Sequence, residues 1–179
     1  MAARKPRLTL VLLACAIGLE AQQYSFQYYG VDQGLSDLAV RSLFQDRRGF
    51  LWLGTENGIF RYDGTRFQPW GKGEGLPASN KSVFGEAPDG RLLVGGDFGL
   101  YGLTGSRFEK VPLPRGGKLS WGAGIRSGPD GKTYIATDAG LVVMSAQGKL
   151  GLVPQPAHSG DAAARGIFAE KNVVWRGLR

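Results

Sequence analysis

Cysteine, histidine and long hydrophobic runs are nearly absent from this sequence. Its 179 residues include one cysteine, Cys15, and one histidine, His158. With so few thiols the chain has no disulfide framework and no thiolate metal site. Without a second histidine or an activated nucleophile we expect no catalytic residue. The sequence therefore favours a binding protein over an enzyme, and we expect no cofactor and no metal.

The chain also lacks a concentrated patch of positive charge. Lys and Arg number 22 against 15 Asp and Glu, which gives a formal net charge of +7. These cations are scattered, with no basic run and no basic stripe interleaved with aromatic residues. We therefore expect no nucleic-acid partner.

The N-terminus has the pattern of an export signal. A basic segment, residues 3–7, precedes the apolar run 8–19, and the small residue Ala21 follows. The run is too short for a membrane span. We therefore expect a signal peptide over 1–21, cleaved after Ala21, and an exported, periplasmic mature chain over 22–179. The alternative is a lipoprotein anchored at Cys15, because "LLAC" resembles a bacterial lipobox.

Glycine, in contrast, is abundant, and its spacing shows a repeat. Two series among the 29 glycines recur every 41 residues: Gly49, Gly90 and Gly131, and Gly58, Gly99 and Gly140. The segment "SFQYYG" from Ser25 matches "RFQPWG" from Arg66 at the same spacing. A period of about 40–45 residues is typical of propeller blades.

Each repeat is predicted to form four short strands separated by turns. Alternation along Phe50–Thr55 places Trp52 and Gly54 on one face and Leu53 and Thr55 on the other. Both faces are largely apolar, which predicts burial on both sides. Because propeller blades stack face to face around an axis, the expected fold class is all-β, and specifically a β-propeller.

The repeat places three full four-stranded blades, a partial fourth and an N-terminal closing strand on the chain. The expected bounds are about 35–70, 76–113, 117–153 and 160–179 for the blades and 24–29 for the closing strand. The last copy supplies the first two strands of a blade, and the N-terminal segment supplies its fourth strand. If the ring closed here, that blade would lack its third strand. We therefore expect an incomplete piece of a larger propeller of about seven blades.

Several glycines and tryptophans keep the phase of the repeat and are expected to be structural. The glycines suit turns that need positive φ, and the tryptophans suit packing between blades. These residues are Gly49, Trp52, Gly54, Gly58, Gly64, Gly90, Gly99, Gly131, Gly140 and Trp175. Asp46, Asp89 and Asp130 lie at the first hairpin turns, and the repeat disperses them around the ring, which argues against a metal site.

Candidate ligand contacts lie where the copies stop agreeing. The turns between second and third strands and the connections between blades open on the same face of a propeller, the usual ligand-binding face. The candidates are Glu56, Asn57, Asp97, Phe98 and Asp138, with Trp121 as a stacking residue. The alternative for each is a solvated turn residue.

The first repeat also resembles a known family. "DRRGFLWLGT" from Asp46, "ENGIFRYDG" from Glu56 and the following "RF" are similar to the two-component regulator propeller repeat, and the match weakens in the later copies. That family forms the extracytoplasmic sensor regions of bacterial hybrid histidine kinases, diguanylate cyclases and related regulators. The resemblance implies a ligand-sensing input module, often for carbohydrate-derived signals, joined to a membrane span and an output domain.

Together these observations predict a periplasmic, ligand-sensing β-propeller segment of a bacterial signal-transduction receptor of two-component type. Its expected partners are a small-molecule or oligosaccharide ligand, the remaining blades and the output domain; homodimerisation of the full receptor is left open. We expect no membrane span in this chain. Two alternatives remain: the N-terminal part of a secreted propeller enzyme (hydrolase, lyase or quinoprotein), and a protein-binding adaptor propeller.

Overall fold

The computed structural model of the chain describes residues 25–78, 81–119, 124–154, 166–170 and 173–177. Within these ranges the regular structure consists of strands and three short 3₁₀ turns. The predicted signal peptide with Cys15 and Ala21 lies outside the described residues, as do Trp121 and His158.

Twelve strands form three four-stranded antiparallel sheets, each with its strands in chain order. The first sheet contains β1 (Val40–Gln45), β2 (Leu51–Thr55), β3 (Ile59–Tyr62) and β4 (Phe67–Trp70). The second contains β5 (Val83–Glu86), β6 (Leu92–Gly96), β7 (Gly99–Thr104) and β8 (Arg107–Val111). The third contains β9 (Ile125–Ser127), β10 (Thr133–Thr137), β11 (Gly140–Met144) and β12 (Leu150–Leu152). β13 (Gly166–Glu170) and β14 (Val173–Gly177) form a further antiparallel pair.

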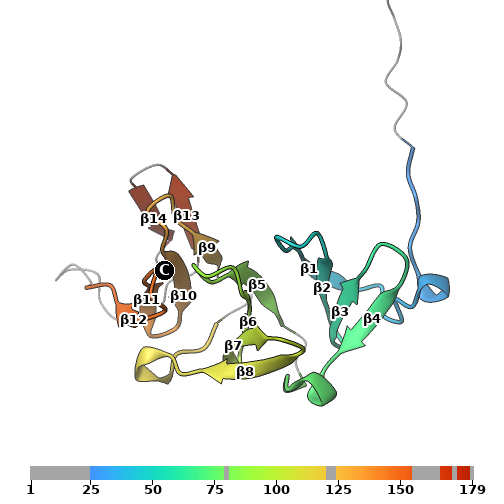
Figure 1. Cartoon of the computed structure of the whole chain (residues 1–179), viewed down its shortest axis with the longest axis horizontal. Coiled ribbons are helices and arrows are strands. Elements are labelled where there is room, and N and C mark those ends of the chain that lie inside the picture. Colours follow the sequence, from blue (N-terminus) through green and yellow to red (C-terminus); the bar gives the residue numbers. More distant parts are fainter. Residues whose placement is uncertain (1–24, 79–80, 120–123, 155–165, 171–172, 178–179) are drawn as a thin grey trace, which may run out of the picture.

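The sheets are arranged like the ribs of a fan (Figure 1). β1, β5 and β9 lie on the inner side of the fan, and β4, β8 and β12 lie on the outer side. The inner strands contact one another, β1 with β5 and β5 with β9, and β13 lies against β9 and β10. This radial arrangement of four-stranded antiparallel sheets confirms the predicted fold class, an all-β fold built from propeller-type blades.

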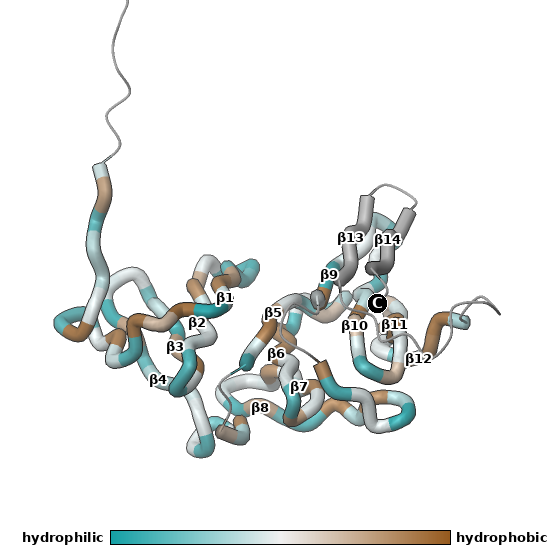
Figure 2. The backbone as a smooth tube through the Cα atoms, turned by 180° about the vertical axis from the view of Figure 1, so that it is seen from behind, coloured by the Kyte–Doolittle hydropathy of each residue, from teal (hydrophilic) through white to brown (hydrophobic). Residues whose placement is uncertain are grey.

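Trp52 on β2 shows how alternation along one strand joins neighbouring sheets. Its side chain is 1% exposed and belongs to a cluster shared by the first and second sheets, whereas Leu53 belongs to a cluster on the opposite face. The predicted burial of both faces of this strand is confirmed. A further cluster, which includes Leu93 and Ile135, joins the second and third sheets. Hydrophobic and hydrophilic positions are interspersed along the chain, in strands as well as in turns (Figure 2).

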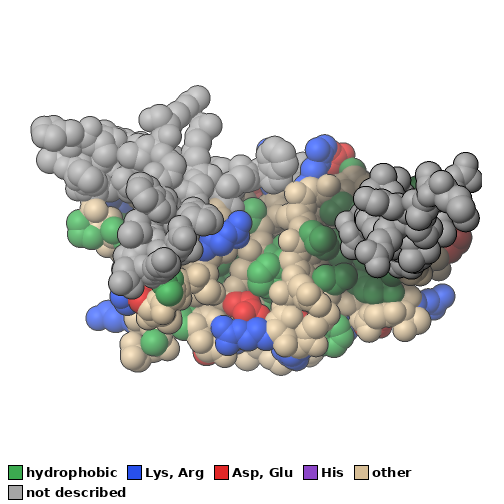
Figure 3. Space-filling view, turned by 90° about the horizontal axis from the view of Figure 1, so that it is seen from above, with side chains coloured by type: hydrophobic (Ala, Val, Ile, Leu, Met, Phe, Trp, Pro, Cys, Tyr) green, Lys and Arg blue, Asp and Glu red, His purple; other side chains and the backbone are tan. Residues whose placement is uncertain are grey.

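The face of the first sheet that is turned away from the second sheet is only partly covered. Leu53 and Phe60 are buried there with Leu35, but Leu43 on β1 is 65% exposed. Phe84, one repeat later, is only 5% exposed because it packs in the cluster between the first two sheets. Figure 3, a view from above, shows hydrophobic side chains at several places on the surface.

The segment predicted as a closing strand leads into the first sheet. Its described part, residues 25–29, is not assigned to a strand among the described residues. Phe26 and Tyr28 are 81% and 91% exposed, while Tyr29 packs edge-on against Tyr62 and Phe67 at ring-centroid distances of 5.3 Å and 5.9 Å. The closing role of this segment stays a prediction.

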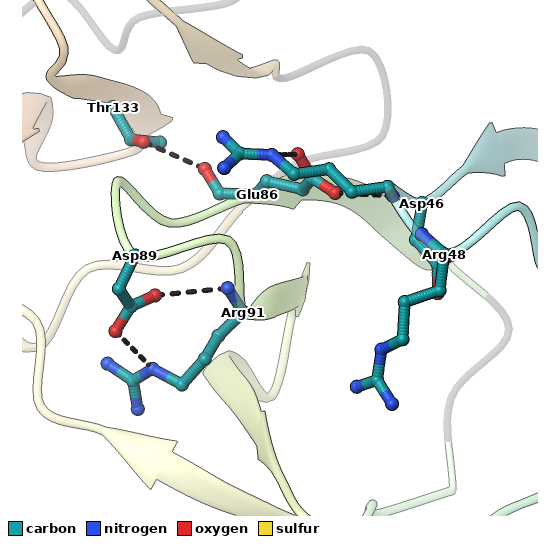
Figure 4. Close-up of polar contacts among 7 residues, drawn as sticks. Asp46, Arg48, Glu86, Asp89, Arg91 and Thr133 are labelled. Carbon is teal, nitrogen blue, oxygen red and sulfur yellow. Dashed lines mark hydrogen bonds and ion pairs between the residues drawn. The ribbon is translucent and has the colours of Figure 1, made fainter.

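Polar contacts at the first hairpin turns join all three sheets. The backbone N–H and the Nε of Arg47 donate to the Glu86 carboxylate at 2.9 Å and 2.6 Å. The backbone carbonyl of Glu86 accepts a hydrogen bond of 2.7 Å from the Thr133 hydroxyl. Glu86 on the second sheet therefore bridges the first and third sheets, while Asp89 pairs with Arg91 of its own turn (Figure 4).

The connections before the first and second sheets form the same 3₁₀ turn. η2 (Val31–Gln33) follows Gly30, and η3 (Lys72–Glu74) follows Gly71. In each, the last side chain of the turn accepts a hydrogen bond of 2.7 Å from the N–H of the preceding glycine. The connection before the third sheet contains η4 (Pro114–Gly116) instead.

A glycine after each of the first two turns allows the connection to approach the outer strand closely. Gly34 and Gly75 have φ of 91° and 90°, a left-handed conformation that strains other residues. A Cβ atom at these positions would collide with the carbonyl oxygens of Phe67 and Phe108 respectively. In the third connection a residue other than glycine, Arg115 inside η4, also has a positive φ, of 57°.

Candidate functional site

The predicted ligand residues lie in the turns between the second and third strands of each sheet. Glu56 and Asn57 are between β2 and β3, Asp97 and Phe98 between β6 and β7, and Asp138 between β10 and β11. The polar members are exposed, and Phe98 is half-buried. The set is thus distributed over three neighbouring sheets rather than gathered at one point.

Hydrogen bonds hold these turns against the connections that precede each sheet. The N–H of Asn57 donates to Asp37 Oδ2 at 2.7 Å, and the N–H of Lys118 donates to Asp138 Oδ1 at 2.7 Å. The two partners are 20 residues apart in both cases. In the first sheet the connection supplies the carboxylate, whereas in the third sheet the turn supplies it. In the first and third sheets the turn and the connection therefore lie side by side.

Two carboxylates at the first turn are already engaged. The backbone N–H of Ala39 is the main cause that lowers the pKa of Asp37 below its usual range, and the N–H of Asn57 adds to this against the opposing effect of desolvation. Glu56 forms an ion pair with Arg41 on β1. Both partners of that pair are exposed, so we assign it little stabilising energy.

In the part of the chain that the structure describes, one cavity opens at this face in the first sheet and another in the second. The larger, of about 370 Å³, lies at the ends of β3 and β4 beside η3, and its lining includes Asn57, Phe60, Pro69, Trp70, Lys72 and Glu74. The smaller, of about 160 Å³, is lined by residues that include Asp97, Phe98, Lys110, Val111, Leu113 and Lys118. Asn57 and Trp70 of the larger cavity correspond, 41 residues later, to Phe98 and Val111 of the smaller one. The two cavities therefore occupy the same place in successive repeats.

The linings of the two cavities differ in chemistry. The larger combines an indole with an amide, an ammonium and a carboxylate, a combination that can hold a ring and hydrogen-bond its polar substituents. In the smaller cavity Val111 replaces the indole, and two lysines accompany one aspartate. Three predicted residues, Asn57, Asp97 and Phe98, line these cavities.

Trp70 is among the cavity residues that the sequence did not predict. Its ring lies edge-on to Trp52 and to Phe108, with centroids 5.0 Å and 5.8 Å apart, and the Arg61 guanidinium carbon is 4.8 Å from its centroid. Contacts of this kind stabilise a ring by about 0.5–2 kcal/mol. The available signal was variation within the repeat, since positions 29, 70 and 111 are Tyr, Trp and Val.

The residues predicted to be structural lie in the strands and turns as follows. Positive φ occurs at Gly49, Gly58, Gly64, Gly90, Gly99, Gly131 and Gly140. Gly54 lies on β2, where a Cβ would meet the Ser42 hydroxyl. Trp175 lies on β14 opposite Phe168 of β13. Trp52 is fully buried.

The aspartates of the first hairpin turns do not converge. Asp46 accepts hydrogen bonds from its own hairpin, Asp89 from Arg91, and Asp130 from Lys132 and Tyr134. In the part of the chain that the structure describes, no group of three or more His, Cys, Asp or Glu side chains is placed to hold a metal ion. The described residues likewise contain no helix long and apolar enough to cross a membrane.

A family comparison identifies the first repeat. Residues 34–57 match the two component regulator propeller family. The matched segment runs from Gly34 through the β2 strand to the turn at Asn57, and it confirms the resemblance predicted from the motifs. No curated protein matches the chain.

Solved propeller structures resemble the fold. Selenomethionine-substituted virginiamycin B lyase from Staphylococcus aureus superposes with a TM-score of 0.52 at 18% identity over 77% of this chain. A catalytically inactive form of that lyase with quinupristin gives 0.54 at the same identity. The chain spans 48% of the length of both lyase structures, and likeness at this identity concerns the fold alone. The extracellular domain of a putative hybrid two component system from B. thetaiotaomicron gives 0.43 at 22% identity, over 85% of this chain and 29% of that one.

Proposed function

We propose that this chain, whose residues 34–57 carry a two component regulator propeller repeat, is a ligand-binding segment of a periplasmic receptor of two-component type. The observation that carries the proposal is the pair of repeat-related cavities on the face formed by turns and connections. Asn57, Asp97 and Phe98 line these cavities, so residues chosen for their divergence between repeats border concave surface.

The proposed ligand is a small molecule or an oligosaccharide. An aromatic wall beside amide, carboxylate and ammonium groups suits a polyhydroxylated ring better than a purely apolar molecule. In this proposal the chain binds and does not catalyse. Its signal would pass through further blades to an output domain of the parent receptor.

Ligand titration of turn variants tests the proposed face. Asp97→Ala, Phe98→Ala, Asp138→Ala and Asn57→Ala are titrated with candidate oligosaccharides, and we expect weaker binding in at least one variant. Asp89→Ala, in a first hairpin turn at the other ends of the strands, is the control and should bind as the wild type does. Unchanged affinity in all four turn variants would remove this face from consideration.

Cell fractionation tests the proposed compartment. A tagged chain with its native N-terminus should be recovered from the periplasmic fraction, shortened by the signal peptide. The lipoprotein alternative predicts recovery with membranes, which Cys15→Ala would abolish. A full-length chain in the cytoplasmic fraction would contradict both.

A further inference from the structure

Trp70 lies at the junction of the larger cavity and the interface between the first two sheets. It lines the 370 Å³ cavity and is half-buried in the interface cluster. Its ring plane makes angles of 72° with Trp52 and 85° with Phe108. These two rings restrict the orientation of the indole before any ligand arrives.

Arg61 on β3 fixes the same ring by stacking. Its guanidinium carbon lies 4.8 Å from the centroid of Trp70 and 4.6 Å from that of Phe50. Its Nη2 donates to Gln68 Oε1 at 2.9 Å, but its buried Nε has no acceptor among the described residues. A buried donor without an acceptor is unfavourable, so contact with the rings rather than a full set of hydrogen bonds holds this guanidinium between them.

The second sheet forms the same strands without this stack. One repeat later, Arg61 is replaced by Gly102, Trp70 by Val111 and Phe50 by Arg91. The second sheet is nevertheless fully formed, and its cavity is the smaller one. Folding of a blade therefore does not require the stack, and the stack coincides with the larger, aromatic cavity.

We propose that Trp70 is the ligand-stacking residue of the larger cavity and that Arg61 is the positioning residue that holds its indole. The ligand class is a saccharide ring, whose apolar face covers the indole while Asn57, in the same lining, hydrogen-bonds its hydroxyl groups. This inference rests on the proposed ligand-binding function of the face. It adds a residue, Trp70, that divergence among the turns alone does not identify.

A glycan-binding experiment separates this inference from the proposed function. The full chain is applied to a printed array of plant and microbial oligosaccharides, and the glycan with the highest signal is titrated by calorimetry. We expect Trp70→Ala to weaken binding about tenfold or more and Trp70→Phe, which keeps the ring contacts, to weaken it less. Phe26→Ala, at an aromatic residue that is 81% exposed and lines neither cavity, is the control and should bind like the wild type.

The outcomes have distinct meanings. Wild-type affinity in both Trp70 variants would overturn the inference and leave the proposed function standing. If the wild-type chain binds no glycan on the array, both the inference and the proposed oligosaccharide ligand would be overturned.

The positioning role of Arg61 is tested by spectroscopy together with binding. The Trp52–Trp70 pair, 5.0 Å apart and steeply inclined, should give an exciton couplet in circular dichroism. We expect Arg61→Met, which keeps the aliphatic stem, to reduce the couplet and to weaken glycan binding several-fold. Arg61→Lys, which keeps the charge, should restore part of both. Arg66→Met, at an exposed position, is the control. An unchanged couplet and affinity in Arg61→Met would overturn the positioning role.

Discussion

The indole N–H of Trp52 donates a hydrogen bond of 2.9 Å to Oδ2 of Asp46. The tryptophan side chain is 1% exposed, so this bond satisfies a buried donor. The other carboxylate oxygen accepts the backbone N–H groups of Arg48 and Phe50, both at 3.0 Å. One side chain thus closes the first hairpin turn and anchors the ring that packs against the next sheet.

Replacement of this carboxylate should destabilise the protein. Asp46→Ala leaves the buried indole N–H of Trp52 without its acceptor, which costs about 1–3 kcal/mol. Urea denaturation of wild type and variant measures the loss. Asp89→Ala is the matched control, because among the described residues that carboxylate bonds Arg91 in an exposed turn, and we expect a clearly smaller change. Equal losses in the two variants would contradict the importance of the Trp52 contact.

Trp52 itself should act through stability. Trp52→Ala removes a fully buried ring from the cluster between two sheets, and we expect the free energy of unfolding to fall by about 3–5 kcal/mol. Thermal and urea unfolding measure this effect. Loss of ligand binding with an unaltered unfolding temperature would show instead that Trp52 is a binding residue.

The fold was accessible from the sequence because one pattern occurs several times. The glycines 41 residues apart mark equivalent turns, and alternation in Phe50–Thr55 predicts the two buried faces that β2 has. Repetition lets each copy test the interpretation of the others, which a single strand pattern cannot provide.

The site was less accessible, because its important contacts depend on neighbours across strands. Arg61 and Trp70 are nine positions apart, and only the antiparallel pairing of β3 with β4 brings their side chains to the same face. Loop divergence identified Asn57, Asp97 and Phe98, which are cavity residues. It had no means of identifying a residue inside a strand.

Gly75 should resist substitution more than its neighbour Gly73. Gly75→Ala places a Cβ against the carbonyl oxygen of Phe108 and imposes a left-handed backbone, so we expect a loss of more than about 1 kcal/mol. Gly73 lies inside the 3₁₀ turn that Gly75 follows, and no atom lies within 4 Å of the site of its Cβ. Gly73→Ala should therefore be nearly neutral in thermal denaturation. A similar loss of stability in both variants would mean that any side chain in this turn is destabilising, and that the close approach of Gly75 to Phe108 is not the cause.

Acid should weaken the contact between the first connection and the first turn. The N–H groups of Ala39 and Asn57 lower the pKa of Asp37 in the folded chain relative to the unfolded one. The contribution of Asp37 to stability is therefore present above the unfolded value of about 4 and is lost as the pH falls through the folded pKa. We expect Asp37→Asn to reduce the dependence of the unfolding free energy on pH below about 4, because this variant has no carboxylate to titrate there. Urea unfolding at a series of pH values measures the slope, and the difference between variant and wild type at pH 7 controls for other effects of the amide. Parallel pH profiles for the two proteins would show that the carboxylate has the same pKa in both states, and that the hydrogen bonds from Ala39 and Asn57 do not favour its charged form.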